Sequence, residues 1–175
     1  ITNISNYLKK KKIDHIKIRE PGGSHNAEKI RKLILNDKSN FNRKTDLLLY
    51  LAARSENIDL FKKNHKKKII LIDRFVDSTI AYQHYGFGID LNLINLINSH
   101  ILNRFKVDFT FLNIIDQKNM IKRLKSRKSL NRYDKLKQKF YLKVQNGFLT
   151  IAKKNKKKYK IIDSNLDKKV NKLLV

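Results

Sequence analysis

The chain has 175 residues, 41% of them hydrophobic, which is enough to bury one core, so we expect residues 1–175 to form a single domain. It contains no cysteine, which excludes a disulfide framework and a thiolate metal site. The formal net charge is +26. No apolar run approaches the ~20 residues of a membrane span, so we expect a cytoplasmic protein without a membrane partner.

Strand and helix patterns alternate from the first residue to the last. The chain opens at Ile1 inside a helical pattern. Four β-branched or apolar runs predict strands at His15–Arg19, Lys68–Asp73, Val107–Ile114 and Tyr159–Asp163. Apolar residues at helical spacing predict helices over 27–34, 47–58, 93–101 and 136–151. Because strands that alternate with helices form parallel sheets covered on both faces, the pattern predicts an α/β fold.

The positive charge is spread along the whole chain. Its lysine runs fall at Lys9–Lys12, Lys62–Lys68 and Lys153–Lys160, on predicted helix ends and turns. A dispersed excess of lysine, together with many isoleucines and asparagines, indicates a general substitution bias rather than a nucleic-acid surface. We therefore expect no dedicated nucleic-acid partner, although the positive field favours anionic nucleotides as ligands.

An acid and an arginine follow the second predicted strand without a spacer. Asp73 and Arg74 stand where that strand ends. Ligands of open α/β sheets bind outside the carboxyl ends of the strands, so this pair falls where phosphates and their metal are handled. A strand end carrying a solvated ion pair is the alternative interpretation of these two residues alone.

Longer motifs extend this observation. The run from Asp73 to Gln83 reads Asp-Arg-Phe-Val-Asp-Ser-Thr-Ile-Ala-Tyr-Gln, and residues 19–23 read Arg-Glu-Pro-Gly-Gly before Ala27-Glu28-Lys29-Ile30-Arg31. Residues 48–54 read Leu-Leu-Tyr-Leu-Ala-Ala-Arg. These motifs, in this order, resemble those of bacterial thymidylate kinases. The resemblance covers nearly the whole chain and implies transfer of the γ-phosphoryl group of ATP to dTMP, with Mg²⁺ as cofactor.

The resemblance implies an acceptor site for dTMP. Arg74 would be catalytic and hold the acceptor phosphate, while Asp73 would be catalytic and order magnesium or its waters. Tyr50 and Arg54 lie four residues apart, hence on one helix face, and would stack on thymine and donate to its edge. The remaining residues implied for this site are Glu20, Pro21, Ser78, Thr79, Tyr82 and Gln83. A buried tyrosine beside an extended arginine is the alternative for Tyr50 and Arg54.

The resemblance also implies a lid and a site for ATP. The segment 123–134 is similar to the family's arginine-bearing lid, so Arg123, Arg127 and Arg132 would close over the donor phosphates, the last two as catalytic residues. Ile161-Ile162-Asp163-Ser164 is similar to the last strand and the loop beside adenine, which implicates Asp163. The family often carries Asp-Arg-x-Glu where this chain has Asn131-Arg132-Tyr133-Asp134. A solvated basic helix that includes Lys125 and Lys128 is the alternative for this segment.

No phosphate-cradling Gly-x-x-x-x-Gly-Lys-Ser/Thr loop is present, because none of the five glycines precedes a lysine. We therefore expect a three-layer sandwich like that of phosphate-loop NTPases, with a parallel sheet that lacks its first, central strand. On this interpretation the chain is an incomplete fragment, inactive by itself and marginally stable, and extension upstream by ~20–25 residues would restore activity.

Two other functions stay open at this stage. One is a nucleotide kinase with a different base specificity. The other is a loop-less, non-catalytic binder of nucleotides or nucleic acids. The resemblance further implies a homodimer.

Overall fold

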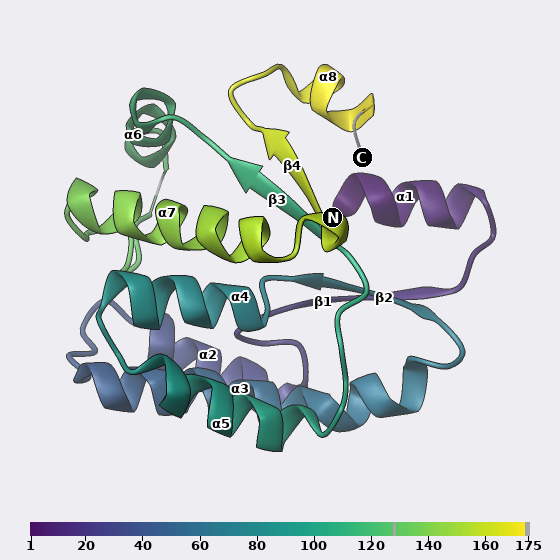
Figure 1. Cartoon of the computed structure of the whole chain (residues 1–175), viewed down its shortest axis with the longest axis horizontal. Helices are drawn as coiled ribbons and strands as arrows, with labels where there is room; N and C mark the ends of the chain where they lie inside the picture. The colour runs from purple at the N-terminus through teal and green to yellow at the C-terminus, as the bar shows by residue number, and fades with distance from the viewer. Residues whose placement is uncertain (128, 174–175) are drawn as a thin grey trace.

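The computed structural model describes residues 1–127 and 129–173, which form helices and strands in alternation (Figure 1). In chain order the elements are α1 (Thr2–Lys10), β1 (His15–Arg19), α2 (His25–Leu35), α3 (Arg43–Asn64), β2 (Ile69–Asp73), α4 (Val76–Thr79), the π-helix η1 (Ile80–Gly86), α5 (Leu91–Leu102), β3 (Thr110–Ile114), α6 (Gln117–Lys125), α7 (Gln138–Lys154), the 3-10 turn η2 (Lys156–Lys158), β4 (Tyr159–Asp163) and α8 (Lys168–Leu173).

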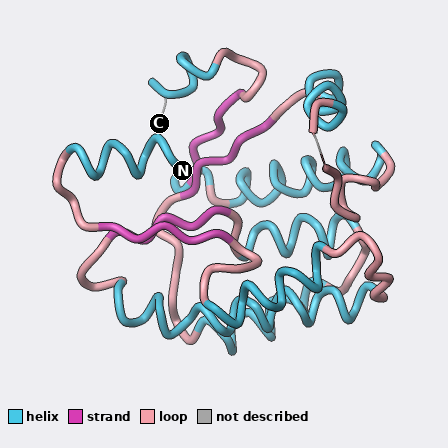
Figure 2. The backbone as a smooth tube through the Cα atoms, turned by 180° about the vertical axis from the view of Figure 1, so that it is seen from behind, coloured by secondary structure: helices cyan, strands magenta, loops and turns pink. Residues whose placement is uncertain are grey.

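The four strands form two parallel pairs (Figure 2). β1 pairs with β2 from His15 opposite Ile69 to Arg19 opposite Asp73. β3 pairs with β4 from Thr110 opposite Tyr159 to Ile114 opposite Asp163. The predicted parallel pairing is confirmed within each pair. The third strand begins at Thr110 rather than Val107, since its only strand partner among the described residues is five residues long.

Helices α2, α3 and α5 lie together on one side of the β1–β2 pair (Figure 1). Their apolar sides form two core clusters, one around Ile18, Ile58 and Phe61 and one around Leu47, Leu51 and Ile94. Each such buried side chain contributes roughly 1.5–3 kcal/mol relative to an exposed one. This packing fixes α3, which carries the predicted base-reading residues, against the strand ends.

Helix α7 packs closely on η1. A Cβ atom at Gly147 would lie 2.6 Å from the Tyr85 ring, and one at Gly86 would lie 2.6 Å from the Phe140 ring. The backbones can therefore approach only because both positions lack a side chain. The predicted helix over 136–151 begins two residues later, at Gln138.

The parallel register brings the first two sequence motifs together. Arg19 and Asp73 are opposite each other at the carboxyl ends of β1 and β2, and the Glu20 backbone N–H donates to the Asp73 carbonyl oxygen at 2.8 Å. The Glu-Pro-Gly-Gly turn and the Asp-Arg motif thus leave the sheet side by side. In the described part of the chain, no helix has the length and apolar character required to cross a membrane.

Candidate active site

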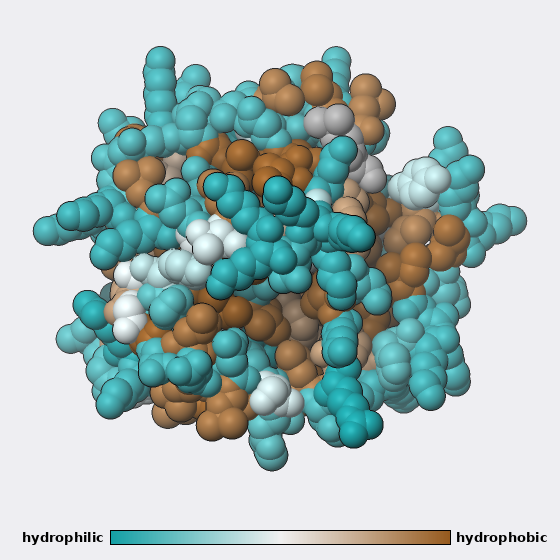
Figure 3. Space-filling model, in the orientation of Figure 1, coloured by the Kyte–Doolittle hydropathy of each residue, from teal (hydrophilic) through white to brown (hydrophobic). Residues whose placement is uncertain are grey.

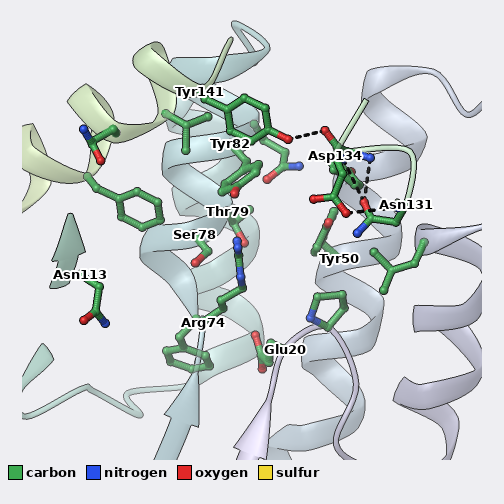
Figure 4. A pocket seen from close by; sticks show the side chains of 18 of the residues that line it. Glu20, Tyr50, Arg74, Ser78, Thr79, Tyr82, Asn113, Asn131, Asp134 and Tyr141 are labelled. Atoms are coloured by element: carbon green, nitrogen blue, oxygen red, sulfur yellow. Dashed lines mark hydrogen bonds between the residues drawn. The ribbon is translucent and has the colours of Figure 1, made fainter. Parts of the chain in front are cut away.

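A cavity of about 510 Å³ opens at these carboxyl ends, bounded by α3, η1, α7 and the segment after α6. Most of the residues predicted for the site line it, and several are drawn in Figure 4. They are Glu20, Pro21, Tyr50, Arg54, Arg74, Ser78, Thr79, Tyr82, Gln83, Arg123 and Arg127. Motifs far apart in the sequence therefore surround one volume.

Three predicted residues do not line this cavity. Asp73 ends β2 with an exposed side chain. Asp163 ends β4, where its carboxylate accepts from the Asn165 backbone N–H at 2.9 Å. Arg132 turns toward the beginning of α3, where it pairs with Asp46 and donates to the Ile34 carbonyl oxygen at 2.6 Å. The geometry thus separates Arg132 from the arginines with which the sequence grouped it.

Arg74 projects into the cavity from the turn after β2 (Figure 4). Its φ of 65° is in the left-handed region, which an arginine adopts only where the surrounding structure enforces it. Arg74 is exposed as a residue, and its guanidinium carbon lies 5.1 Å from the centre of the Tyr82 ring, a cation–π distance. Backbone and ring together aim a permanent positive charge at the centre of the site.

Arg54 is held rigidly beneath the cavity, with 2% of the residue exposed. Its Nε donates to Glu20 at 2.9 Å, its Nη1 to the Asn98 side-chain oxygen at 2.6 Å and its Nη2 to Thr79 at 3.1 Å. Glu20 is also buried, and burial raises its pKa while the charge of Arg54 lowers it, with a net upward direction. The pair fixes α3 to the turn after β1, so Arg54 has a structural partner set that its sequence spacing did not reveal.

Two tyrosine rings and one side-chain amide line another part of the cavity. Tyr50 presents a half-buried ring, and Tyr82 faces it from η1 (Figure 4). Gln83 is 1% exposed, and its amide nitrogen has no hydrogen-bond partner among the described residues. A buried donor without a partner is costly, so this nitrogen is available to an acceptor on a ligand.

Several lining residues were not predicted as site residues, among them Arg31, Tyr133, Tyr141 and Phe148. Arg31 donates to the Pro21 carbonyl oxygen at 2.6 Å, and burial lowers its pKa with the charges of Arg19 and Arg74 adding to that direction. A signal for it exists, because it shares a helical face with the buried Ala27 and Ile34, where a charged side chain is unusual. Phe148 was predicted to be core, and it both packs in α7 and lines the cavity.

The predicted lid segment begins in α6 and continues as a loop. Arg123 donates to the Ser164 carbonyl oxygen at 2.6 Å, and Arg127 pairs with Asp134 at 2.5 Å. Asn131, where the family pattern has an acid, accepts from the backbone N–H groups of Tyr133 and Asp134. Lys128 lies outside the described residues. Two arginines of the segment that the sequence predicts to be a lid, Arg123 and Arg127, are therefore held by specific contacts in the fold.

Comparison with known proteins gives concordant matches. A family model described as thymidylate kinase matches residues 1–173. The thymidylate kinase of Acholeplasma laidlawii is 35% identical over 168 residues, which cover 94% of this chain and 83% of that protein. That of Thermosipho africanus is 38% identical over 152 residues, covering 86% and 75%. The crystal structure of thymidylate kinase from Ehrlichia chaffeensis superposes with a TM-score of 0.76 at 29% identity, covering 97% of this chain and 84% of that one.

Proposed function

The chain belongs to the thymidylate kinase family, a family of phosphotransferases, and from this premise we propose how its residues act in the transfer of the ATP γ-phosphoryl group to dTMP. The observation that carries the proposal is the cavity itself. It is lined by Arg31 and Arg74, which suit a phosphate, and by the Tyr50 ring, which suits the face of a pyrimidine base. The buried amide of Gln83, whose nitrogen has no partner among the described residues, suits the edge of that base.

Arg74 and Arg31 hold the acceptor phosphate. The nucleophile in this reaction is a phosphate oxygen that is already anionic near neutral pH, so no strong general base is required. Catalysis depends on alignment and on neutralisation of charge. A guanidinium supplies both, since it grips phosphate oxygens in a planar fork and stays protonated.

Thymine lies against Tyr50 and is read by Gln83. The free amide nitrogen of Gln83 donates to a base carbonyl, and its amide oxygen accepts from the base N–H; with the amide in this orientation, cytosine presents an acceptor where the base N–H is required. Arg54 supports this edge from beneath, as its bonds to Glu20 and Thr79 keep the floor of the pocket in place. Tyr82, with Ser78 and Thr79, lies at the deoxyribose, where an added 2′-hydroxyl would collide with the ring.

The donor side takes ATP, with Arg123 and Arg127 over its phosphates and Asp163 near adenine. Mg²⁺ in kinases is held largely by substrate phosphates and one or two carboxylates, so Asp73 at the end of β2 would be the residue that helps to hold it. When bound, the ion would neutralise charge on the transferred group.

A homodimer is the proposed assembly. Leu33, Leu48, Leu93 and Leu96 are exposed on α2, α3 and α5, which pack side by side. Exposed apolar side chains that gather on neighbouring helices are typical of protein interfaces.

The test is calorimetric titration of the chain with dTMP, dCMP and dAMP, followed by an assay for dTDP with ATP and Mg²⁺. We expect dTMP to bind at least tenfold more tightly than the other two, because only its base matches Gln83. Equal affinities would favour a kinase of different base specificity. Tight dTMP binding that no upstream extension of the chain converts into dTDP formation would favour a non-catalytic binder.

A further inference from the structure

The loop after α6 docks onto the beginning of α3 through a buried carboxylate. Asp46 lies in the first turn of α3 and is 5% exposed, and one of its oxygens pairs with the Arg132 guanidinium. The same guanidinium donates from Nε to the Ile34 carbonyl oxygen and lies over the Phe41 ring at 5.6 Å. Arg132 is therefore held by contacts with α2, α3 and the turn between them.

Tyr133 shares that carboxylate. Its hydroxyl donates to the second Asp46 oxygen at 3.2 Å, its backbone N–H donates to Asn131, and its carbonyl oxygen accepts from the Tyr141 hydroxyl at 2.7 Å. Burial raises the pKa of Tyr133, with Tyr50 and Asp46 acting in the same direction, so the hydroxyl stays a donor. The residue is fixed at both its backbone and its hydroxyl end.

The ring of Tyr133 forms part of the cavity wall. It is 8% exposed and meets Tyr50 edge to face at 6.1 Å and Tyr82 edge to face at 6.2 Å. Those two rings are the ones assigned above to the base and to the sugar. Edge-to-face pairs resist displacement of either ring, so the position of Tyr133 determines where Tyr50 and Tyr82 stand.

We propose that Tyr133 is a specificity-determining residue for the nucleoside part of the acceptor, and that Asp46 and Arg132 are positioning residues that hold it in the wall. The inference rests on the proposed function. Arg132 neutralises Asp46, which would otherwise be a buried carboxylate without a partner, and Asp46 then anchors the Tyr133 hydroxyl. Arg132 belongs on this basis to the acceptor pocket and does not touch the donor phosphates.

The test compares dTMP, thymidine and ribothymidine monophosphate as calorimetric ligands of the whole chain and of Tyr133→Ala, Tyr133→Phe, Arg132→Met and Arg132→Lys. We expect Tyr133→Ala to weaken dTMP and thymidine by the same factor, at least tenfold, because a wall acts on base and sugar. In Tyr133→Ala, the ratio of the dissociation constants of ribothymidine monophosphate and dTMP should fall at least threefold, because Tyr82 loses its neighbouring ring. Tyr133→Phe keeps the ring and should lose about threefold, the scale of one modest hydrogen bond.

Arg132→Met should weaken both ligands about threefold to tenfold, and Arg132→Lys should recover part of that loss. The matched control is Asp37→Asn, which breaks the exposed Lys135–Asp37 pair between the same two regions and should change neither ligand. Titrations are run well below the melting temperature of each variant. The conservative pair Tyr133→Phe and Arg132→Lys decides the matter if the larger changes unfold the chain.

Three results would overturn the inference. Unchanged affinities for dTMP and thymidine in both Tyr133 variants would show that the Tyr133 ring does not shape the nucleoside pocket. A loss in Arg132→Met that affects dTMP but spares thymidine would place Arg132 on a phosphate. Failure of the unmodified chain to bind dTMP would overturn the proposed function as well, which separates that failure from the other two.

Discussion

Arg54 and Arg74 both line the cavity, but their side chains have different surroundings. Arg54 is buried, and its donors are taken by Glu20, Asn98 and Thr79. Arg74 is exposed and rests on the Tyr82 ring without a carboxylate partner among the described residues. The first arginine therefore maintains the shape of the pocket, and the second is available for a ligand.

Arg74→Ala should weaken dTMP and leave thymidine unaffected. A hydrogen bond to a charged group contributes about 1.5–3 kcal/mol, so the dTMP dissociation constant should rise roughly 10- to 100-fold. Calorimetry with both ligands measures this, and thymidine is the internal control because it lacks the phosphate. Equal weakening of the two would assign Arg74 to the nucleoside instead.

Arg54→Met should destabilise the fold. It leaves Glu20 buried without its partner, and breaking a buried ion pair from one side costs about 3–5 kcal/mol. Urea unfolding followed by circular dichroism gives the difference. Arg19→Met is the control, since its pair with Glu28 is exposed and its loss should cost under about 1 kcal/mol. Similar costs for the two variants would argue against a structural role for the buried pair.

At the level of elements, strands and long helices could be predicted because apolar periodicity depends on near neighbours. The ends of β1 and β4 were predicted to the residue, and most residues predicted for the acceptor site line one cavity. The π-helix η1 was not predictable, since it depends on packing against α7. The contact between Arg132 and Asp46 joins positions 86 residues apart, so a local pattern of basic residues could not distinguish it from a phosphate-facing lid.

Gly147→Ala tests the close approach of α7 and η1. Alanine in place of glycine usually stabilises a helix by roughly 0.5–1 kcal/mol. Here the added methyl group would meet the Tyr85 ring at 2.6 Å, so we expect a destabilisation of about 1–3 kcal/mol, the opposite sign. Urea unfolding provides the number, with Asn146→Ala on the exposed side of the same helix as a control that should be neutral or stabilising. Stabilisation by Gly147→Ala would mean that the two helices can separate at no cost.

The whole molecule carries a net charge of +26, and hydrophilic side chains cover most of the face seen in Figure 3 rather than one stripe of it. Only a few of its arginines and lysines have carboxylate partners among the described residues. Repulsion between so many like charges opposes the compact state, and dissolved salt screens it.

Melting temperature should therefore rise with ionic strength. The Debye length falls from ~30 Å at 0.01 M to ~10 Å at 0.1 M salt, so most of the gain is expected within that interval. Scanning calorimetry in sodium chloride measures it. Trehalose at matched osmolality, which adds no ions, controls for effects of solute exclusion. A melting temperature that is flat or falls across this range would show that repulsion does not limit stability.

The left-handed backbone of Arg74 places this residue under two conflicting selection pressures. Glycine adopts a φ of 65° freely, whereas a residue with a side chain loses about 1–2 kcal/mol there. A change from arginine to glycine at this position would thus increase the stability of the protein while removing the guanidinium that we propose holds the acceptor phosphate. Screens for thermostable variants should therefore enrich for changes at Arg74, and the proposed catalytic role of this residue would be kept at the expense of stability.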